Sequence, residues 1–460
     1  MIRANLGDSL ASIFNFGFDF SKPTFLLATA VQASSSIVLA GVLLSLVVIY
    51  FTSKLGGEIS HRFGFPTVLG ELVGGVLIGV SAFHILIFAN GNDARSNSMI
   101  VAFLQATNGL SAEATPATFA SISEILYDFS ELGVIILLFE IGLESNLREL
   151  LKVGAQAAIV AVVGVTVPFA LGTVGLMLLF HMSAIPAIFA GAALTATSIG
   201  ITSKVLSELG QLNSKEGQII LGAAVIDDVL GIMVLAVVAS LAKTGKVDVT
   251  NVVLLIVGAT VFLLGAIWLG RFFNRAFIRV INRLKTRGGV IVPAMIFALS
   301  MAYLGAALHL EAILGAFAAG LVLEESDPRK ELEVLLKPIS DIFVPIFFVS
   351  VGAKTDLGVL NPLIPENREG LIIATFLIVV AILGKVVTGF TIRGKVPINR
   401  LAIGVGMIPR GEVGLVFAGV GAASGALSPA LNAAILVMVI VTTFIAPPLL
   451  GIVLPRKRAN

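Results

Sequence analysis

The sequence predicts an all-helical protein that crosses a membrane many times, and three observations carry this prediction. Hydrophobic residues make up 57% of the 460 residues and charged residues only 13%, whereas soluble domains contain about 25% charged residues. The mean hydropathy is +1.03. The apolar residues gather in runs of about 20, which is the length that a helix needs to cross a bilayer. Because only helices and closed barrels satisfy the backbone inside lipid, these runs predict transmembrane helices.

We expect about thirteen transmembrane helices within residues 36–453, with an N-terminal extension over 1–35 and a basic tail over 454–460. The spans lie near 36–55, 66–90, 124–145, 152–180, 184–209, 215–242, 251–275, 287–309, 310–326, 338–358, 370–393, 399–425 and 428–453. The ninth is short, and the tenth contains Asp341 and Lys354. The polar segment 90–123 is expected to be an external loop. Glycines at four-residue spacing in the second span predict closely packed helices.

Basic residues alternate between the predicted loops. Alternate loops on one side collect most of the Lys and Arg residues, among them Arg271, Arg275, Arg279 and Arg283, whereas the other side holds few. These four arginines recur every four residues and predict a basic stripe that contacts lipid headgroups. The asymmetry predicts a cytoplasmic C-terminus and an odd number of spans. It also explains the basic residues of a chain with net charge +2, so no nucleic-acid partner is expected.

Two adjacent aspartates, Asp227 and Asp228, stand in the middle of the sixth span, GQIILGAAVIDDVLGIMVLAVVASLA. A charged side chain at the bilayer centre costs roughly 2.5 to 3.5 kcal/mol, so the pair needs compensation. Lys385 in the eleventh span is the expected cation. Because adjacent helical residues point about 100° apart, one aspartate can pair with Lys385 while the other faces a cavity. A purely structural ion pair would not need the second aspartate.

The fifth and twelfth spans are interrupted near their middles. AALTATSIGITSKV places Thr197 and Ser198 at mid-span, and GVGMIPRGEVGLVF places Pro409 before Arg410 and Glu412. Non-helical backbone at this depth is tolerated only where it is buried in protein or lines a cavity. The interrupted spans are fifth in each of two halves, spans 1–6 and 8–13, which predicts inverted repeats with a transporter site at the two breaks. The symmetry rests on position, because no residue-level repeat is visible.

These segments, in this order, resemble the monovalent cation:proton antiporter-2 branch of the cation:proton antiporter superfamily. AAVIDDVLG, TATSIGIT, ILGKVVTG and MIPRGEVGL carry the resemblance, together with FPTVLGELVGGVLIG, ELGVIILLFEIGLE, LGAFAAGLVLE and PIFFVSVGAKTDL. Any one segment is a weak signal, but the ordered set is specific. The likeness is strongest to bacterial sodium/proton antiporters that consist of a membrane domain alone.

The resemblance implies a role for each residue of the site. Asp228 would bind the transported proton or monovalent cation, and Asp227 would be a second ligand of that cation. Asp227 would also be the partner of Asp228 and would form a salt bridge with Lys385. Thr197 or Ser198 would line the ion site where the broken helices cross.

The resemblance also implies how the helices are organised. Arg410 and Glu412 would be the charged pair that stabilises the second broken helix. The implied fold is a homodimer in the lipid bilayer, in which a core over 152–242 and 370–453 moves like an elevator. The core would move against a dimerisation scaffold over 36–145 and 287–358, to which a linker helix over 251–275 connects it. An adjacent Asp-Asp pair is the pattern associated with electrogenic exchange.

The residues themselves favour the same chemistry. A proton and a sodium ion can compete for the same carboxylate oxygens, and sodium prefers the carboxylate, hydroxyl and carbonyl oxygens that this site offers. No cofactor is expected. Selection among sodium, lithium and potassium depends on cavity size and stays open, as does the ratio of protons to cations. A bacterial cytoplasmic membrane or another energy-coupling membrane is the expected location, and pH homeostasis the expected use.

Three alternatives remain. A potassium/proton exchanger or potassium efflux protein of the same superfamily would use similar residues, although the glutathione-gated relatives carry Gln-Asp and a nucleotide-binding domain. A cation channel is possible in principle, but no repeated filter motif is visible. An intramembrane aspartyl protease would need two aspartates that face each other from separate helices. Metalloprotease and nucleotide-binding motifs are absent, so the chain is not expected to be an enzyme.

Overall fold

The computed structural model describes residues 35–88, 98–244, 286–308, 310–326, 328–361, 363, 365–392 and 398–454, with scattered positions over 250–284. Every regular element within these ranges is a helix, as the sequence predicts. The N-terminal extension, most of the expected linker helix over 251–275 and nearly all of the basic tail fall outside the described residues. So do Arg271 and Arg275 of the predicted basic stripe.

Within the described part of the chain, six helices are long and apolar enough to cross a membrane. They are α2 (Ser35–Arg62), α7 (Gly154–Leu179), α10 (Lys215–Thr244), α14 (Arg329–Ala353), α15 (Pro365–Phe390) and α18 (Pro429–Val453). Shorter apolar helices are α3 (Thr67–Ile78), α4 (Met99–Asn108), α8 (Ala184–Ala193), α12 (Ile291–Ala307) and α13 (Ala312–Glu324). The 30-residue helix α5 (Thr115–Glu144) covers the third predicted span and carries five acidic residues.

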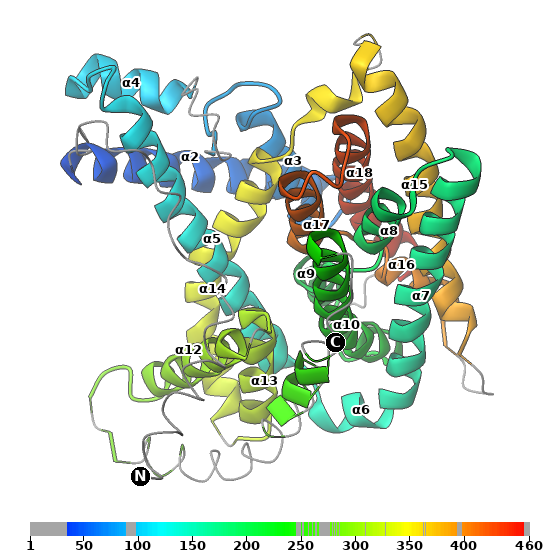
Figure 1. The fold of residues 1–460 in the computed structure, drawn as a ribbon. Coiled ribbons are helices and arrows are strands. Elements are labelled where there is room, and N and C mark those ends of the chain that lie inside the picture. Colours follow the sequence, from blue (N-terminus) through cyan, green and yellow to red (C-terminus); the bar gives the residue numbers. More distant parts are fainter. Residues whose placement is uncertain are drawn as a thin grey trace, which may run out of the picture.

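The helices form two bundles that stand side by side in Figure 1. The scaffold bundle contains α2, α3, α5, α12, α13 and α14, which pack on one another, with α4 on α2. The core bundle contains α7, α8, α10, α15 and α18, together with the half-helices α9 (Ile199–Glu208), α16 (Arg400–Gly406) and α17 (Glu412–Ala423). The short helix α6 (Leu147–Lys152) connects the two. The bundles meet where α5 and α3 contact α9, and where α3 contacts α18.

Glycine residues allow the scaffold helices to approach closely. A methyl group on Gly75 of α3 would overlap the carbonyl oxygen of Val349 on α14, and one on Gly352 would overlap the carbonyl oxygen of Leu72. Gly70 makes the same kind of approach to Gly56 of α2. The glycine spacing in the second predicted span therefore marks helix packing, as predicted.

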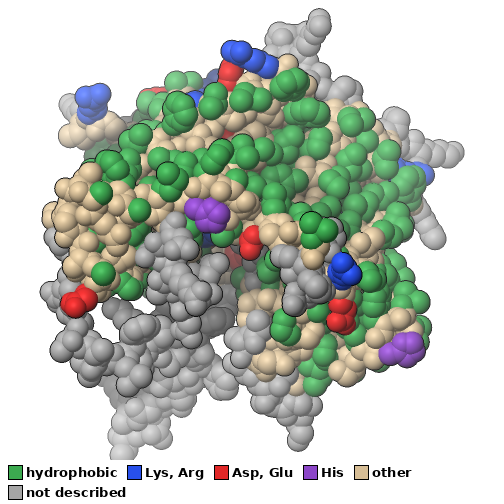
Figure 2. Space-filling view, turned by 90° about the horizontal axis from the view of Figure 1, so that it is seen from above, with side chains coloured by type: hydrophobic (Ala, Val, Ile, Leu, Met, Phe, Trp, Pro, Cys, Tyr) green, Lys and Arg blue, Asp and Glu red, His purple; other side chains and the backbone are tan. Residues whose placement is uncertain are grey.

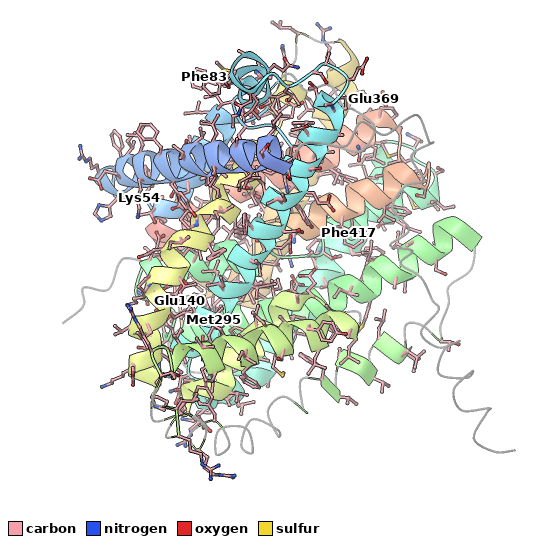
Figure 3. The ribbon with its side chains drawn as sticks, turned by 90° about the vertical axis from the view of Figure 1, so that its left-hand side faces the viewer. Lys54, Phe83, Glu140, Met295, Glu369 and Phe417 are labelled. Carbon is pink, nitrogen blue, oxygen red and sulfur yellow. The ribbon has the colours of Figure 1, made fainter. Side chains whose placement is uncertain are left out.

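The core bundle packs around large apolar side chains. Leu176, Phe189, Leu377 and Met438 belong to one buried cluster drawn from α7, α8, α15 and α18. Phe417 of α17 joins this cluster and is fully buried; Figure 3 labels it within the core bundle. This packing encloses the two places where helices are broken.

The outer surface is apolar. Figure 2 shows the molecule from above, with hydrophobic side chains spread over the described part of this face and few charged side chains between them. Large side chains along α2 are open, including Val47 at 63% and Phe51 at 70% exposure. Such a surface fits a lipid environment, because a soluble protein rarely exposes a continuous apolar face of this size.

Two sequence-based boundaries are wrong. The second span does not continue as a helix to residue 90, because α3 ends at Ile78 and the chain turns back, with a positive φ of 52° at His84. Leu86 is nevertheless buried, at 1% exposure, so the apolar run reflects packing and not helix length. The segment 90–123 is also more than a loop. It contains α4, whose Ile100 and Leu104 are buried against the scaffold bundle.

Candidate functional site

The two broken helices meet inside the core bundle, as the sequence predicts. The first break, 194–198, separates α8 from α9, and the second, 407–411, separates α16 from α17. The backbone N–H of Ser198 donates to the carbonyl oxygen of Pro409 at 2.8 Å. The hydroxyl of Thr197 donates to the carbonyl oxygen of Met407 at 3.2 Å. The crossing therefore satisfies one backbone N–H of the first break and two backbone carbonyl oxygens of the second.

Local sequence explains why the chain is extended at these points. Pro409 has no N–H to give to a helix, and its ring disfavours a helical conformation at the residue before it. Gly411 gives space, because a methyl group there would press on the side chain of Ser198. The first break is rich in hydroxyl residues, and Thr195 turns its own hydroxyl to the carbonyl oxygen of Ala192 at 2.7 Å.

The two aspartates of α10 lie deep inside the core bundle beside the first break. Asp227 is 0% exposed and Asp228 is 2% exposed. The ammonium group of Lys385 lies 3.1 Å from Oδ2 of Asp227. The same ammonium group donates to the carbonyl oxygen of Thr195 at 2.7 Å. Lys385 therefore connects α15, α10 and the first break.

A glycine of α7 gives Lys385 its space. A methyl group on Gly164 would lie 3.2 Å from Nζ of Lys385 and 3.4 Å from Cγ2 of Thr388. The first distance is tighter than an ordinary contact, so a larger side chain at this position would press on the lysine. Sequence reasoning missed Gly164, because a single glycine in an apolar run carries no signal of what packs against it.

Arg410 joins the second break to the first. Its side chain is fully buried. One guanidinium nitrogen, Nη1, donates to the carbonyl oxygen of Thr195 at 3.0 Å and also to that of Ala196. The carbonyl oxygen of Arg410 accepts a hydrogen bond from the hydroxyl of Thr443 on α18. Arg410 thus holds in place two carbonyl groups of the first break, just after α8 ends at Ala193.

The side chain of Glu412 lies outside the described part of the structure, although its backbone begins α17. The pairing of Arg410 with Glu412 therefore stays a prediction. Thr443 is a further residue that sequence reasoning missed, because a threonine inside an apolar helix more often bonds to its own backbone.

The buried charges of the site balance. Among the described residues, the buried ionisable side chains are Asp227, Asp228, Lys385 and Arg410, two of each sign. Within the same part of the chain, Oδ1 of Asp227 and Oγ of Ser198 are buried and accept or donate no hydrogen bond. Carboxylate, hydroxyl and carbonyl oxygens are the ligands that a hard cation prefers. The site therefore offers oxygen atoms of the kind that bind a hard cation or a proton.

The other ionisable groups in predicted spans lie away from the crossing. Glu71 of α3 accepts a hydrogen bond from Ser53 at 2.8 Å within the scaffold bundle. It borders a cavity of about 370 Å³, to which Lys204 of α9 and Asp341 of α14 also contribute. Glu140 lies on α5 of the scaffold bundle (Figure 3). Neither belongs to the crossing.

Comparison with known proteins gives a consistent answer. The family described as sodium/hydrogen exchanger, transmembrane, matches residues 47–456. The chain is 62% identical over 426 residues to the high-affinity Na(+)/H(+) antiporter NhaS3 of Synechocystis sp., with 92% of each chain covered. It is 34% identical over 413 residues to the Na(+)/H(+)-K(+) antiporter GerN of Bacillus cereus, covering 88% of this chain and 94% of that one.

Solved structures extend the comparison to the fold. The sodium proton antiporter MjNhaP1 from Methanocaldococcus jannaschii at pH 8 matches with a TM-score of 0.58 and 16% identity, covering 90% of this chain and 96% of that one. At this identity the likeness concerns the fold alone. Together with the match over residues 47–456, it leads to one conclusion: the chain belongs to the transmembrane sodium/hydrogen exchanger family.

Proposed function

We propose that this protein exchanges sodium for protons across a membrane, and that the two compete for the carboxylate of Asp228. One observation carries the proposal: two adjacent carboxylates are buried beside the crossing of the broken helices, and Asp227 already holds a direct ion pair with Lys385 at 3.1 Å. Asp228 points about 100° away from Asp227 around α10. It is therefore the carboxylate best placed to take a mobile cation, with Thr197 or Ser198 as further oxygen ligands.

Competition at one carboxylate is enough to couple the two ions. A proton and a sodium ion each bring one positive charge, so either one changes the charge of the balanced cluster by the same amount. A core bundle that crosses only when one of them is bound cannot move empty. Exchange then follows, because each crossing carries either a proton one way or a cation the other.

The division into two bundles supports alternating access by movement of the core. Both broken helices, both aspartates and Lys385 belong to the core bundle, so the whole site can move as one body. The scaffold bundle would stay fixed and would form the contact between two copies in a homodimer. We place the protein in a bacterial cytoplasmic membrane or another energy-coupling membrane, with its C-terminus in the cytoplasm and a role in pH homeostasis.

A potassium/proton exchanger is the second candidate. GerN is named as an Na(+)/H(+)-K(+) antiporter, and it is 34% identical to this chain. The same oxygens can bind potassium or lithium, so the substrate has to be measured.

The test is proton movement in proteoliposomes that contain the purified protein and an internal pH dye. Sodium, lithium and potassium are added in turn to wild type, Asp228→Asn and Asp128→Asn. Asp128 is an exposed aspartate on α5 of the scaffold bundle, so its variant controls for the loss of one carboxylate. We expect a dye response to sodium in wild type and in Asp128→Asn. In Asp228→Asn the rate of sodium-driven proton movement should fall by at least about a hundredfold, because an amide neither takes up a proton nor offers a negative charge to a cation.

An unchanged response in Asp228→Asn would disprove competition at this carboxylate. A sodium current without proton movement would indicate a channel, since a channel does not couple the two ions. A response to potassium but not to sodium would show that potassium, and not sodium, is the transported cation, and the proposed competition at Asp228 would stand.

A further inference from the structure

Polar contacts between the two bundles gather at one end of the molecule, where α9 ends. This is the end that the distribution of basic residues predicts to be cytoplasmic. The beginning of α9, in contrast, meets the scaffold bundle through apolar packing, for example between Ile199, Val134 and Phe347 of one buried cluster. The last residues of α9 therefore make a different kind of contact from its first residues.

Glu208, the last residue of α9, caps a helix of the other bundle. Its carboxylate accepts the backbone N–H of Thr67 at 2.6 Å, and it also accepts the hydroxyl of Thr67. Thr67 is the first residue of α3, which Pro66 precedes, so no side chain at the N-cap position satisfies the free N–H groups there. A carboxylate at a helix N-terminus is favourable because of the helix dipole. Here that carboxylate comes from the core bundle and acts on the scaffold bundle.

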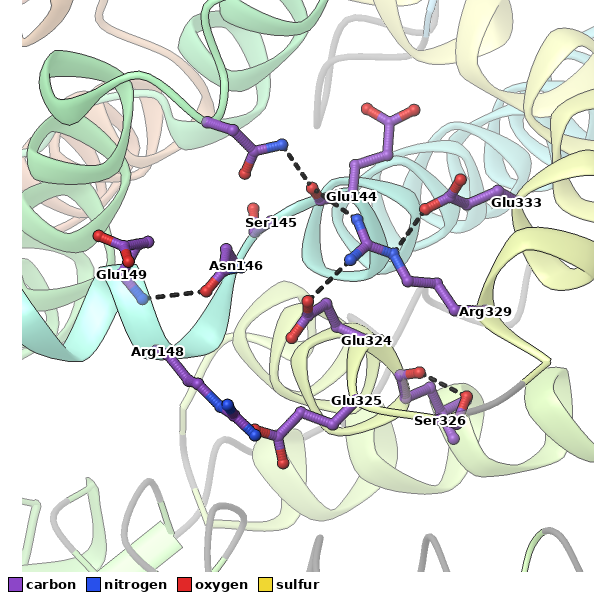
Figure 4. A network of polar contacts seen from close by, with 12 residues as sticks. Glu144, Ser145, Asn146, Arg148, Glu149, Glu324, Glu325, Ser326, Arg329 and Glu333 are labelled. Carbon is purple, nitrogen blue, oxygen red and sulfur yellow. Dashed lines mark hydrogen bonds and ion pairs between the residues drawn. The ribbon is translucent and has the colours of Figure 1, made fainter.

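Glu144, the last residue of α5, receives a second set of contacts. The hydroxyl of Ser207 donates to the Glu144 carboxylate at 3.0 Å, and the side-chain amide of Asn213 donates to the Glu144 carbonyl oxygen at 2.9 Å. Figure 4 shows this carbonyl oxygen shared with Arg329, whose Nη2 lies 3.3 Å away.

Arg329 makes the scaffold side of this contact rigid. It forms ion pairs with Glu324 at 2.7 Å and Glu333 at 2.8 Å, which tie the end of α13 to α14 (Figure 4). Residues 207–213 of the core bundle therefore dock on a fixed polar platform, which makes their contacts specific to one position of the core.

We propose that Ser207, Glu208 and Asn213 form a releasable latch, which holds the core bundle to Thr67 and Glu144 in this conformation and must open before the core can move. The idea rests on the proposed function, because only a moving core needs a latch. The same half-helix begins at Ile199, directly after Ser198 of the proposed ion site, and ends at Glu208, a length of 10 residues or about 15 Å. A displacement of the site along α9 is thus passed directly to the latch.

The latch predicts a shift in conformational equilibrium when Glu208 is removed. The chain contains no cysteine, so spin labels can be placed at Lys215→Cys on the core bundle and Lys330→Cys on the scaffold bundle, both exposed. Double electron–electron resonance on the purified protein in lipid nanodiscs then reports the distance between the bundles. We expect Glu208→Ala to raise the ratio of displaced to latched populations by about tenfold, because hydrogen bonds to a charged group are lost.

Glu216→Ala is the matched control. Glu216 of α10 also accepts a backbone N–H, that of Asn399 at 2.7 Å, but this contact lies within the core bundle. Its removal should leave the distance distribution as in wild type. Glu208→Gln, which keeps an acceptor oxygen, should give a smaller shift than Glu208→Ala and serves as the test if the alanine variant does not fold.

Two outcomes would overturn the latch. One is a distance distribution in Glu208→Ala and Glu208→Gln that matches wild type. The other is an equal shift in Glu208→Ala and Glu216→Ala, which would show a general effect of losing a carboxylate. Failure of the proposed function appears elsewhere, as an Asp228→Asn variant that still exchanges ions, and the distance measurement does not depend on that result.

Discussion

The core and scaffold bundles solve the same packing problem but differ in what they bury. Helices approach closely at glycine in both: a methyl group on Gly404 would overlap the backbone of α15, and one on Gly352 would overlap that of α3. In the described part of the chain, the buried charged side chains are Asp227, Asp228, Lys385 and Arg410, all in the core bundle. The scaffold bundle buries serine and threonine hydroxyls, such as those of Ser45 and Thr118.

This difference separates what keeps the protein folded from what it uses to work. A buried charge is costly unless it is paired, and a well-packed apolar pair of similar volume is often as stable. If stability were the only requirement, both bundles could be packed with apolar side chains, glycine contacts and buried hydroxyl groups, as the scaffold bundle is. The charges of the core are therefore best explained by a task in which charge changes, whereas the glycine contacts inside the scaffold bundle should matter through volume.

Removing one buried charge should have the largest effect. In Lys385→Ala the carboxylate of Asp227 loses the cation that lies 3.1 Å away, and breaking a buried pair costs about 3 to 5 kcal/mol. We expect a clear drop in the thermal unfolding midpoint in detergent and loss of sodium-driven proton movement. Scanning calorimetry and the liposome assay measure the two effects.

The double variant Asp227→Asn/Lys385→Met sharpens the comparison. It removes both charges, so the unfolding midpoint should recover most of the loss while transport stays absent. Wild-type stability in Lys385→Ala would show that Asp227 does not depend on this cation, and the contrast between the bundles would then have to be abandoned.

A volume change in the scaffold bundle should have an intermediate effect, on stability alone. The side chain in Gly75→Val would overlap the carbonyl oxygen of Val349, and overpacking of this kind costs about 1 to 3 kcal/mol. The unfolding midpoint should fall, while the transport rate per folded molecule stays near that of wild type.

Gly419→Ala is the control for this prediction. Gly419 has open space around its Cα, with nothing within 4 Å of an added methyl group. Alanine favours the helix more than glycine does, so this variant should be neutral or slightly more stable. If Gly75→Val abolished transport while leaving the midpoint unchanged, the scaffold would have a role beyond packing.

The sequence alone predicted those features that require an unusual residue type, such as a charge or a proline inside an apolar span. Asp227 and Lys385 stand out because charges in apolar runs need partners, and the second break is marked by Pro409 and the glycines near it. The carbonyl oxygen of Thr195 accepts hydrogen bonds from the side chains of Lys385 and Arg410. The sequence could not predict this role, because every residue has a carbonyl group. Gly164 was missed for a related reason: its role depends on a neighbour from a distant span.

The predicted span boundaries were wrong where an apolar segment is buried without being helical. The apolar run after Ile78 is buried without being helical, so a window of hydropathy could not find the end of α3. The contact of Glu208 with Thr67 was also invisible, because a glutamate at the end of a span is indistinguishable from one that faces water. Only the fold brings the end of α9 to the beginning of α3.

The smallest effect is expected from a neutral hydrogen bond at the crossing. Thr443→Val keeps the shape of the side chain but removes the bond to the carbonyl oxygen of Arg410, at a cost of about 0.5 to 1.5 kcal/mol. Thr442 is the matched control, because its hydroxyl donates at 2.8 Å to Met438 of its own helix. Thr443→Val should lower the apparent affinity for sodium in the liposome assay severalfold, whereas Thr442→Val should not. Equal effects would mean that α18 supports the site by packing alone, and the core would then differ from the scaffold only at its four charges.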